Sequence, residues 1–394
     1  MFRLWTKREA RDLFFGGALL AAAALLLLFP QESLAAAREG LSLCGNVIIP
    51  SLFPFFILSS LVVELGLASY LGRLLEPIMR PLFRVSGACA SALALGFVGG
   101  YPVGARTAIA LYRNGDCSKV EAERLLAFCN NSGPAFVLGV VGAGVFASSG
   151  AGVMLYLAHA AASLCVGLLF RFYGRRQERE SPAGYVPRFE AKRFSFAFTS
   201  SVGTALQSTL NICAFVVFFT VVIRLLFRSG ALSSLARLMG LLLGPLGFSQ
   251  GWAERLLTGL IELSSGVSAL SGGGALGGRL TMAAFMLGWA GLSVHCQVLS
   301  FLGDSGLSIR TYFLGKLLHG GLAALFTGLL VRVLPLETAP AAALAEQVEV
   351  ITGMDFRATL TLSVAAAWVV GVCFLLLALA ALRKSAGKRR PFII

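Results

Sequence analysis

Long apolar segments separated by short polar ones make up most of the chain. Eight of them are long enough to cross about 30 Å of hydrocarbon, which takes roughly 20 residues in a helix; they are 13–29, 45–68, 125–147, 151–172, 203–227, 281–302, 311–333 and 360–382. Two more apolar segments, 87–111 and 253–270, are interrupted by Gly, Pro and Ser. The pattern predicts an all-α polytopic membrane protein with about eight transmembrane helices and two broken helical hairpins.

The distribution of charge gives these spans a direction. Only 13% of the 394 residues are charged, against roughly 25% in a soluble domain, so a soluble globular protein is excluded. The net charge of +14 comes largely from the amino tail, the 171–193 linker and the carboxyl tail, whereas the 335–358 loop is acidic. Because cytoplasmic flanks carry the excess of Lys and Arg, both termini and the linker are expected in the cytoplasm. Anionic lipids, and no nucleic acid, then account for the basic residues.

The same rule predicts that the two interrupted segments are re-entrant. If 87–111 crossed the membrane completely, the basic 171–193 linker would lie outside; if it enters and leaves on one side, every basic flank lies inside. The same argument holds for 253–270 and the carboxyl tail. Non-helical backbone at membrane depth is tolerated only where protein or a polar cavity surrounds it. The two breaks are therefore predicted to line a site.

An internal repeat relates the two interrupted segments. LGRLLEPIMRPL (71–82) aligns with LARLMGLLLGPL (235–246), and the same offset places VGGYPVGA (98–105) over ELSSGVSA (262–269). With the orientation above, the two copies are inverted, and paired interrupted segments in inverted halves indicate a transporter site near the bilayer midplane. Alternatively, these Gly and Pro residues only allow close helix packing. The chain then divides into a tail and first span (1–40), a first repeat (41–172), a linker (173–200), a second repeat (201–334) and a last span with its loop and tail (335–394).

The first repeat offers six candidate binding residues. Arg106 follows the first break, where a guanidinium could hold a carboxylate through two hydrogen bonds, and Tyr101 and Thr107 are nearby donors. Arg106 could equally lie at the cytoplasmic rim. Polar side chains also occur together within a span, and these could be ligands or interhelical hydrogen-bonding groups: Asn130, Asn131 and Ser132.

The second repeat supplies the matching candidates. Ser264 and Ser265 flank its break, and His295 and Gln297 lie in the span equivalent to the asparagine cluster. Glu262 is a candidate counter-charge for Arg106 or a proton carrier. His159 and His319 could couple protons to transport or serve as packing groups, and Lys316 could reach the interface or help to neutralise an anion.

Several kinds of chemistry are not indicated. The eight cysteines and three histidines show no ligand spacing, so neither disulfides nor a metal site is expected. No phosphate loop or hydrolase motif occurs, so neither an enzyme, a cofactor nor an ATP-driven pump is predicted. The polar segment YRNGDCSKVEAERL (112–125) is expected to be a solvated cytoplasmic helix without a chemical role.

Three blocks carry a family resemblance: NVIIPSLFPFFILSSL (46–61), GYPVGARTAIALYRNGDCSKVEAERLLAFCNNSGPAFVLGVVGAGVF (100–146) and GLSVHCQVLSF (291–301). Here the chain resembles the sporulation integral membrane proteins that carry a nucleoside-recognition Gate domain. The resemblance implies a fold similar to concentrative nucleoside transporters. It also implies a role in moving dipicolinic acid out of the mother cell, across the outer forespore membrane.

The leading hypothesis is a secondary transporter of a small organic anion, dipicolinate, that works by alternating access between the inverted repeats. A nucleoside transporter with the same architecture is an alternative, and so is a sporulation scaffold that transports nothing. The oligomeric state, a homo-oligomer included, is left open by the sequence.

Overall fold

A computed structural model describes residues 7–65, 67–174, 193–303 and 305–334. Throughout these ranges the regular structure is helical, with no strand, which confirms the all-α fold class. Four described segments are long and apolar enough to cross a membrane, namely Ser149–Phe170, Phe194–Arg228, Leu276–Leu302 and Ile309–Val333. A bent pair, Phe15–Leu28 and Pro30–Asn46, adds a fifth. The expected last span, 360–382, and the acidic loop before it lie outside the described residues.

The first span does not continue straight into the second. Helix α1 (Lys7–Leu28) is followed at a 96° bend by α2 (Pro30–Leu43). Pro30 occupies the first turn of α2, where its missing N–H costs no helical hydrogen bond. The chain then continues through a short π-helical segment, η1 (Cys44–Ile48), into α3 (Ile49–Glu64).

The interrupted segment 87–111 forms a hairpin, as predicted. After α4 (Leu67–Phe83), helix α5 (Cys89–Gly99) ends at Gly100, whose φ of +74° favours glycine, and α6 (Val103–Arg113) runs back beside it. A Cβ added to Gly104 would lie 3.0 Å from the Cα of Gly96. Eight residues apart in one straight helix, these two residues would be separated by about 12 Å. The chain therefore folds back on itself between them.

The equivalent segment of the second half folds in the same way. Helix α10 (Ala231–Leu243) and a 3-10 turn, η4 (Gly244–Leu246), precede α11 (Gln250–Ile261) and the short α12 (Leu263–Ser268). Glu262, between them, has extended backbone. A Cβ added to Gly266 would lie 2.1 Å from the Cα of Gly259, so the second hairpin is also tightly closed.

Two of the expected spans, 125–147 and 281–302, are interrupted. Helix α7 (Lys119–Phe128) unwinds over residues 129–133 before a π-helical segment, η2 (Ala135–Val145). Helix α13 (Leu276–Trp289) meets α14 (Gly291–Leu302) at Ala290, which has a φ of +84°. The remaining long helices are α8 (Ser149–Phe170), α9 (Phe194–Arg228) and α15 (Ile309–Val333). Each half thus contains a hairpin followed by a broken helix and a continuous one.

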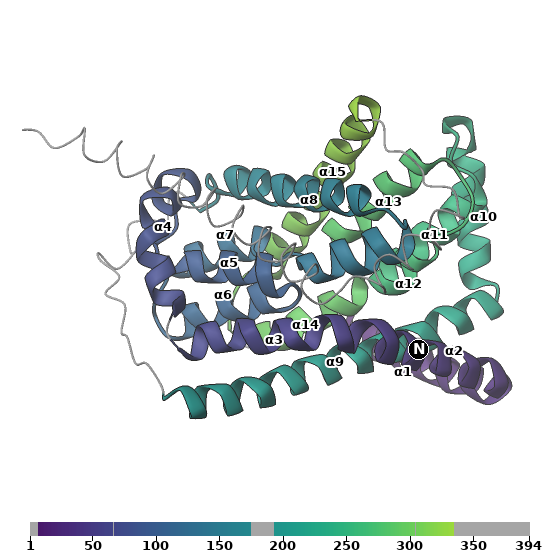
Figure 1. The fold of residues 1–394 in the computed structure, drawn as a ribbon. Coiled ribbons are helices and arrows are strands. Elements are labelled where there is room, and N and C mark those ends of the chain that lie inside the picture. The colour runs from purple at the N-terminus through teal and green to yellow at the C-terminus, as the bar shows by residue number, and fades with distance from the viewer. Residues whose placement is uncertain (1–6, 66, 175–192, 304, 335–394) are drawn as a thin grey trace, which may run out of the picture.

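The two halves are arranged in opposite directions. Figure 1 shows α4 and the α5–α6 hairpin at one end of the bundle, with α10 and the α11–α12 hairpin at the other. The chain segments that align in the repeat therefore occupy opposite ends, as an inverted repeat requires. Helices α3 and α9 run side by side along one face. The main hydrophobic core joins the two halves, since it contains buried residues of α5 to α8 and of α12 to α15.

The expectation of a solvated helix over residues 112–125 is wrong for its second half. Glu121, Glu123 and Arg124 on α7 are buried, with Arg124 completely inaccessible. The carboxylate of Glu121 accepts backbone N–H groups from Ser86 at 2.7 Å and from Ser118 at 2.9 Å. Charged side chains are thus placed inside the protein because they satisfy backbone groups of other segments.

The neighbouring charges on α7 act in the same way on more distant segments. The guanidinium of Arg124 donates to the carbonyl oxygens of Arg84 at 2.7 Å and of Tyr173. The carboxylate of Glu123 accepts the N–H of Ser308 and the hydroxyl of Tyr173, each at 2.8 Å. Helix α7 therefore fastens the ends of α4, α8 and α15 to one another.

Candidate functional site

The two hairpin tips meet at one small cavity inside the bundle. This central cavity has a volume of about 60 Å³ and lies between the breaks of both halves and the helices α3 and α9. Its wall combines polar groups at the breaks with apolar side chains from the long helices. The lining includes Gly100, Tyr101, Ser132 and Gly133 from the first half, Glu262, Ser264, Ser293 and Gln297 from the second, and Ile48, Leu52, Ile212 and Val216.

A wider and more polar space adjoins the central cavity at Gln297. This space, the Arg106 pocket, has a volume of about 550 Å³ and lies between α3, α6, α9 and α14. Its polar lining comprises Ser60, Glu64, Arg106, Thr107, Thr204, Gln207, Ser208, Asn211, Gln297 and Ser300.

A third space lies beyond the central cavity on the other side. This space, the Asn46 pocket, also has a volume of about 550 Å³ and is lined by Leu43, Asn46, Pro50, Gly139, Val140, Gly144, Val145 and Ser268. Along η1 and α3, Asn46 and Pro50 line this pocket, Ile48 and Leu52 the central cavity, and Phe56, Ser60 and Glu64 the Arg106 pocket. From Asn46 to Glu64 a helix rises about 27 Å, close to the thickness of the hydrocarbon core. The three spaces therefore follow one another across a membrane-sized distance.

Helical periodicity explains which side chains of α6 face the Arg106 pocket. Val103, Arg106, Thr107 and Ala110 line it at the spacing of one helix face, while the opposite face is buried in the core. Arg106 is exposed within the pocket, and the Thr107 hydroxyl donates back to the carbonyl of Val103 at 2.9 Å. Arg106 thus lies beside the break and not at its tip.

The second break is organised by Glu262. Its carboxylate is buried and accepts the backbone N–H groups of Ser264 at 3.0 Å and Ser265 at 2.6 Å, which caps α12. Glu262 and Ser264 line the central cavity, whereas the Ser265 hydroxyl lies 3.4 Å from that of Thr220 on α9. Among the described residues Glu262 and Arg106 form no ion pair, so the expected counter-charge pairing is absent there.

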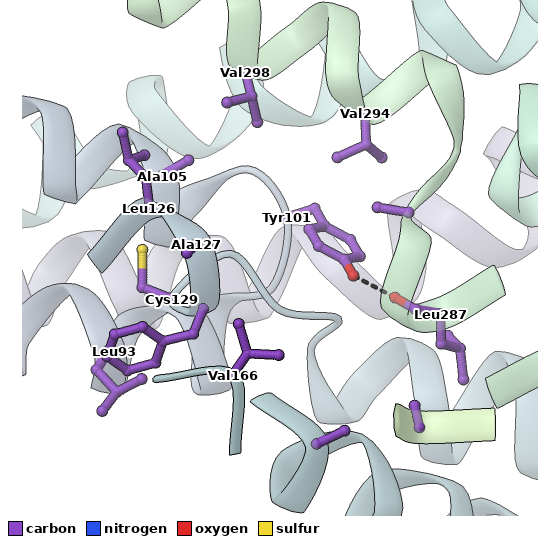
Figure 2. Packing of buried hydrophobic residues seen from close by; sticks show 14 of the residues in the cluster. Leu93, Tyr101, Ala105, Leu126, Ala127, Cys129, Val166, Leu287, Val294 and Val298 are labelled. Carbon is purple, nitrogen blue, oxygen red and sulfur yellow. Dashed lines mark hydrogen bonds between the residues drawn. The ribbon is translucent and has the colours of Figure 1, made fainter. Parts of the chain in front are cut away.

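A fully buried lysine connects the halves behind the cavity. Lys316 Nζ donates to the carbonyl oxygen of Asn130 at 2.8 Å and to Tyr101 Oη at 3.2 Å, and it lies 4.8 Å from the centre of the Tyr101 ring. The Tyr101 hydroxyl donates in turn to the carbonyl of Leu287 on α13, the contact drawn in Figure 2. The expectation that Lys316 reaches the membrane interface is wrong, because its side chain points into the bundle and is completely inaccessible.

The histidines and asparagines lie in the layer behind the cavity wall. His159 Nε2 accepts the N–H of Ser132 at 3.0 Å, and His319 Nε2 lies 3.0 Å from the carbonyl of His159. His295 Nδ1 lies 3.0 Å from the hydroxyl of Tyr312. All three rings are completely buried, so they pack and hydrogen-bond inside the protein.

The unwound segment retains unused hydrogen-bonding capacity. Asn130 Nδ2 reaches Tyr312 at 3.5 Å and Asn131 Nδ2 reaches the carbonyl of Phe128 at 3.0 Å. The Oδ1 atoms of both asparagines and the Ser132 hydroxyl have no partner within the described part of the chain. Of these residues, Ser132 lines the cavity, although its hydroxyl oxygen is itself buried.

The contribution of α9 to the Arg106 pocket was not predicted from the sequence. Thr204, Gln207, Ser208 and Asn211 recur at helical spacing within an apolar span and together form one wall of the Arg106 pocket. That spacing was a usable signal, since polar groups inside a span face protein or a water-filled space. Across the described ranges no group of three or more metal-ligating side chains occurs, and the cysteines found there are free.

Comparisons with known proteins agree with this architecture. The Gate family model, described as nucleoside recognition, matches residues 47–205. Sporulation integral membrane protein YlbJ of Bacillus subtilis (strain 168) is 35% identical over 338 residues, which are 79% of this chain and 80% of that protein.

Solved structures of the transporter CNTnw share the fold. In an inward-facing substrate-bound state it matches 83% of this chain and 88% of its own, with a TM-score of 0.52 and 15% identity. A variant in its intermediate 2 state matches 82% and 86%, with a TM-score of 0.54 and 16% identity. Likeness at these identities shows the fold alone. The identity to YlbJ over most of both chains shows that this chain belongs to the YlbJ family of sporulation integral membrane proteins.

Proposed function

We propose that the chain is a secondary transporter that moves a small organic solute through the three spaces along α3. The proposal rests on the order of the three spaces along the helix. Two pockets of about 550 Å³ lie on either side of a cavity of about 60 Å³, and the cavity lies where the two hairpin tips meet. A scaffold protein has no need of such an arrangement.

The volumes suggest where the solute would be held back. Sites for small molecules usually measure about 300–1,000 Å³, so either pocket could hold a small organic solute while the central cavity could not. Passage would require the hairpin tips to separate from α3 and α9 on one side at a time. We propose that the two repeats, 41–172 and 201–334, supply these two gates and so produce alternating access.

The cargo that we propose is a small organic anion, with dipicolinate as the leading candidate. The Arg106 guanidinium is exposed in the wider polar pocket, where it could hold one carboxylate of a planar dianion through two hydrogen bonds. Ser132, Ser264 and Gln297 could then receive it in the central cavity. The relationship to a sporulation protein supports this cargo, because dipicolinate is made in spore formation, and it supports a place in the outer forespore membrane.

The orientation follows from the basic segments. Helix α9 begins directly after the basic 171–193 linker, and its first half lines the Arg106 pocket. With that linker in the cytoplasm, the Arg106 pocket would open to the cytoplasm and the Asn46 pocket to the opposite side. Both termini would then be cytoplasmic.

A nucleoside is the second candidate cargo. The central cavity offers hydroxyl, amide and carboxylate groups and no cationic side chain in its wall, which suits a neutral hydrogen-bonding solute. The description of the Gate family as nucleoside recognition favours the same class. In this case Arg106 would have no direct role in binding.

Exchange in proteoliposomes distinguishes these functions. Vesicles loaded with dipicolinate should take up radiolabelled dipicolinate, and excess uridine should not compete. Replacing the charged hydrogen bonds in Arg106→Gln should slow exchange by about tenfold or more, with Arg106→Lys intermediate and Arg310→Gln, an exposed arginine on α15, unchanged.

Other outcomes would overturn parts of the proposal. Wild-type exchange by both Arg106 variants would remove Arg106 from the binding site. Competition by uridine, together with exchange of labelled uridine, would assign the nucleoside cargo. If well-folded protein exchanged neither solute, the transporter would be excluded in favour of a scaffold.

A further inference from the structure

Lys316 is a buried lysine that has no part in the proposed binding sites. It lies on α15, is completely inaccessible and lines none of the three spaces. Among the described residues no carboxylate lies within ion-pair distance of its Nζ. Burying a charge without a counter-charge is costly, and ionisable groups inside a membrane usually have a functional role.

The three hydrogens of the ammonium match three acceptors. Nζ donates to the carbonyl oxygen of Asn130 at 2.8 Å and to Tyr101 Oη at 3.2 Å, and it lies 3.4 Å from His319 Nδ1. The His319 ring can accept there because its Nε2 faces the carbonyl of His159 at 3.0 Å. The geometry therefore fits the protonated amine, with every N–H satisfied.

Two of these acceptors, Asn130 and Tyr101, belong to the parts of the first half that must move in transport. Asn130 lies in the unwound segment 129–133, and Tyr101 lies at the tip of the α5–α6 hairpin and lines the central cavity. Carbonyl groups of unwound segments carry partial negative charge and hold the coupling cation in many transporters. Here the ammonium of Lys316 takes the place of such an ion.

The other groups around Lys316 leave it as the one strongly basic side chain in its surroundings. From its own helix it faces His319, from the hairpin tip Tyr101, from α8 His159, from α14 His295, and from the unwound segment Cys129. None of these groups is a carboxylate, so none of them supplies a counter-charge to the ammonium. Loss of a proton from Lys316 would therefore change the charge of the whole cluster by one unit.

We propose that Lys316 is the proton-coupling site of the transporter, an inference that rests on the proposed function, and that the coupling ion is a proton. When Lys316 is protonated, its three donors hold together Tyr101 of the hairpin tip, the Asn130 carbonyl of the unwound segment and His319 of α15. When the tip moves and water enters, the ammonium transfers one proton to that water. The neutral amine keeps two N–H groups, so one of the three contacts is lost and the tip is released.

The test separates exchange from accumulation. In proteoliposomes without Na⁺, the wild type should exchange radiolabelled dipicolinate at equal pH on both sides and should accumulate it when a pH gradient is imposed. Lys316→Met and Lys316→Arg should retain exchange, but their pH-driven accumulation should fall at least tenfold. Neither replacement side chain can take up and release a proton as the lysine does. Lys119→Met, an exposed lysine at the start of α7, should behave as wild type.

Each outcome bears on a different claim. If the wild type exchanges the label but accumulates it only with a Na⁺ gradient, the inference is overturned. This outcome uses the wild type alone, so it does not depend on whether the variants fold. Full pH-driven accumulation by folded Lys316→Met, checked by size-exclusion chromatography, also overturns it. A wild type that exchanges neither dipicolinate nor uridine overturns the proposed function itself.

Discussion

The carboxylate of Glu123, on α7, accepts the backbone N–H of Ser308, which caps α15, at 2.8 Å. Its other oxygen accepts the Tyr173 hydroxyl, also at 2.8 Å, at the end of α8. Burial raises the pKa of Tyr173, and the hydrogen bond to Glu123 raises it further, so the hydroxyl remains a donor at neutral pH. One acidic side chain thus joins three helices from both halves of the chain.

Glu123→Ala should lower the free energy of unfolding by about 1.5–2 kcal/mol, because it leaves two half-buried donors without their charged acceptor. Glu123→Gln should cost less, since an amide oxygen can replace one acceptor. The exposed pair of Glu76 and Arg80 provides the control, because Glu76→Ala should cost under about 1 kcal/mol. Thermal unfolding of the purified protein in detergent measures all three. Equal losses in Glu123→Ala and Glu76→Ala would contradict the structural role of Glu123.

Gly96→Ala should prevent closure of the first hairpin. Its Cβ would lie 1.8 Å from the carbonyl oxygen of Cys129, a backbone atom that cannot move aside without shifting the unwound segment. A loss of about 3 kcal/mol or more is expected. Gly203→Ala on α9, where no atom lies within 4 Å of the new Cβ, should instead gain about 0.5–1 kcal/mol. Unfolding midpoints of the two variants should therefore shift in opposite directions; a stable Gly96→Ala protein would show that the hairpin is looser than described.

Glu262→Ala should loosen α12 without unfolding the protein. The change removes both acceptors that hold the N–H groups of Ser264 and Ser265, at a cost of about 1–2 kcal/mol for a lost N-cap. Hydrogen exchange read by mass spectrometry should speed up in peptides covering 262–268. Ser148→Ala, which removes the cap of α8 at Ala151, is a matched control whose effect should be confined to the start of α8. Unchanged exchange in 262–268 would mean that Glu262 does not support the break.

Single cysteines should show from which side of the membrane the Arg106 pocket and the Asn46 pocket are accessible. In a variant without native cysteines, Thr107→Cys in the Arg106 pocket should react with a membrane-impermeant maleimide added from the cytoplasmic side. Ser268→Cys in the Asn46 pocket should react from the opposite side. Ala162→Cys, completely buried on α8, should react from neither. Labelling of both pocket positions from the same side would refute the order of the three spaces across the membrane.

The interrupted hairpins were predictable because their signal is local. Gly, Pro and Ser within an apolar segment mark a break wherever the rest of the chain lies, and the basic flanks then require a re-entrant path. Tyr101, Ser132, Glu262, Ser264 and Gln297 do line one cavity, as their positions beside the breaks suggested. Their roles in binding stay predictions.

The parts that were missed depend on contacts between distant segments. Arg124 and Glu123 looked solvated because nothing in their own sequence shows that Arg84, Tyr173 and Ser308 bring backbone groups to them. Lys316 looked like an interfacial lysine for the same reason, since Asn130 lies 186 residues before it. Arg106 was assigned to the break by closeness in sequence, but one helical turn is enough to put it in the adjoining pocket.

The contacts between the halves set an order for synthesis in the cell. Residues 119–134 find Ser308, Tyr312 and Lys316 as partners, at sequence separations of 185, 182 and 186 residues. At about 5–20 residues per second the ribosome needs about 10–40 s to make the intervening chain. During that interval the first half has entered the bilayer with a carboxylate, an asparagine and a free carbonyl that still await their partners. The first half must therefore remain in the membrane with these polar groups unpaired until α15 has been synthesised.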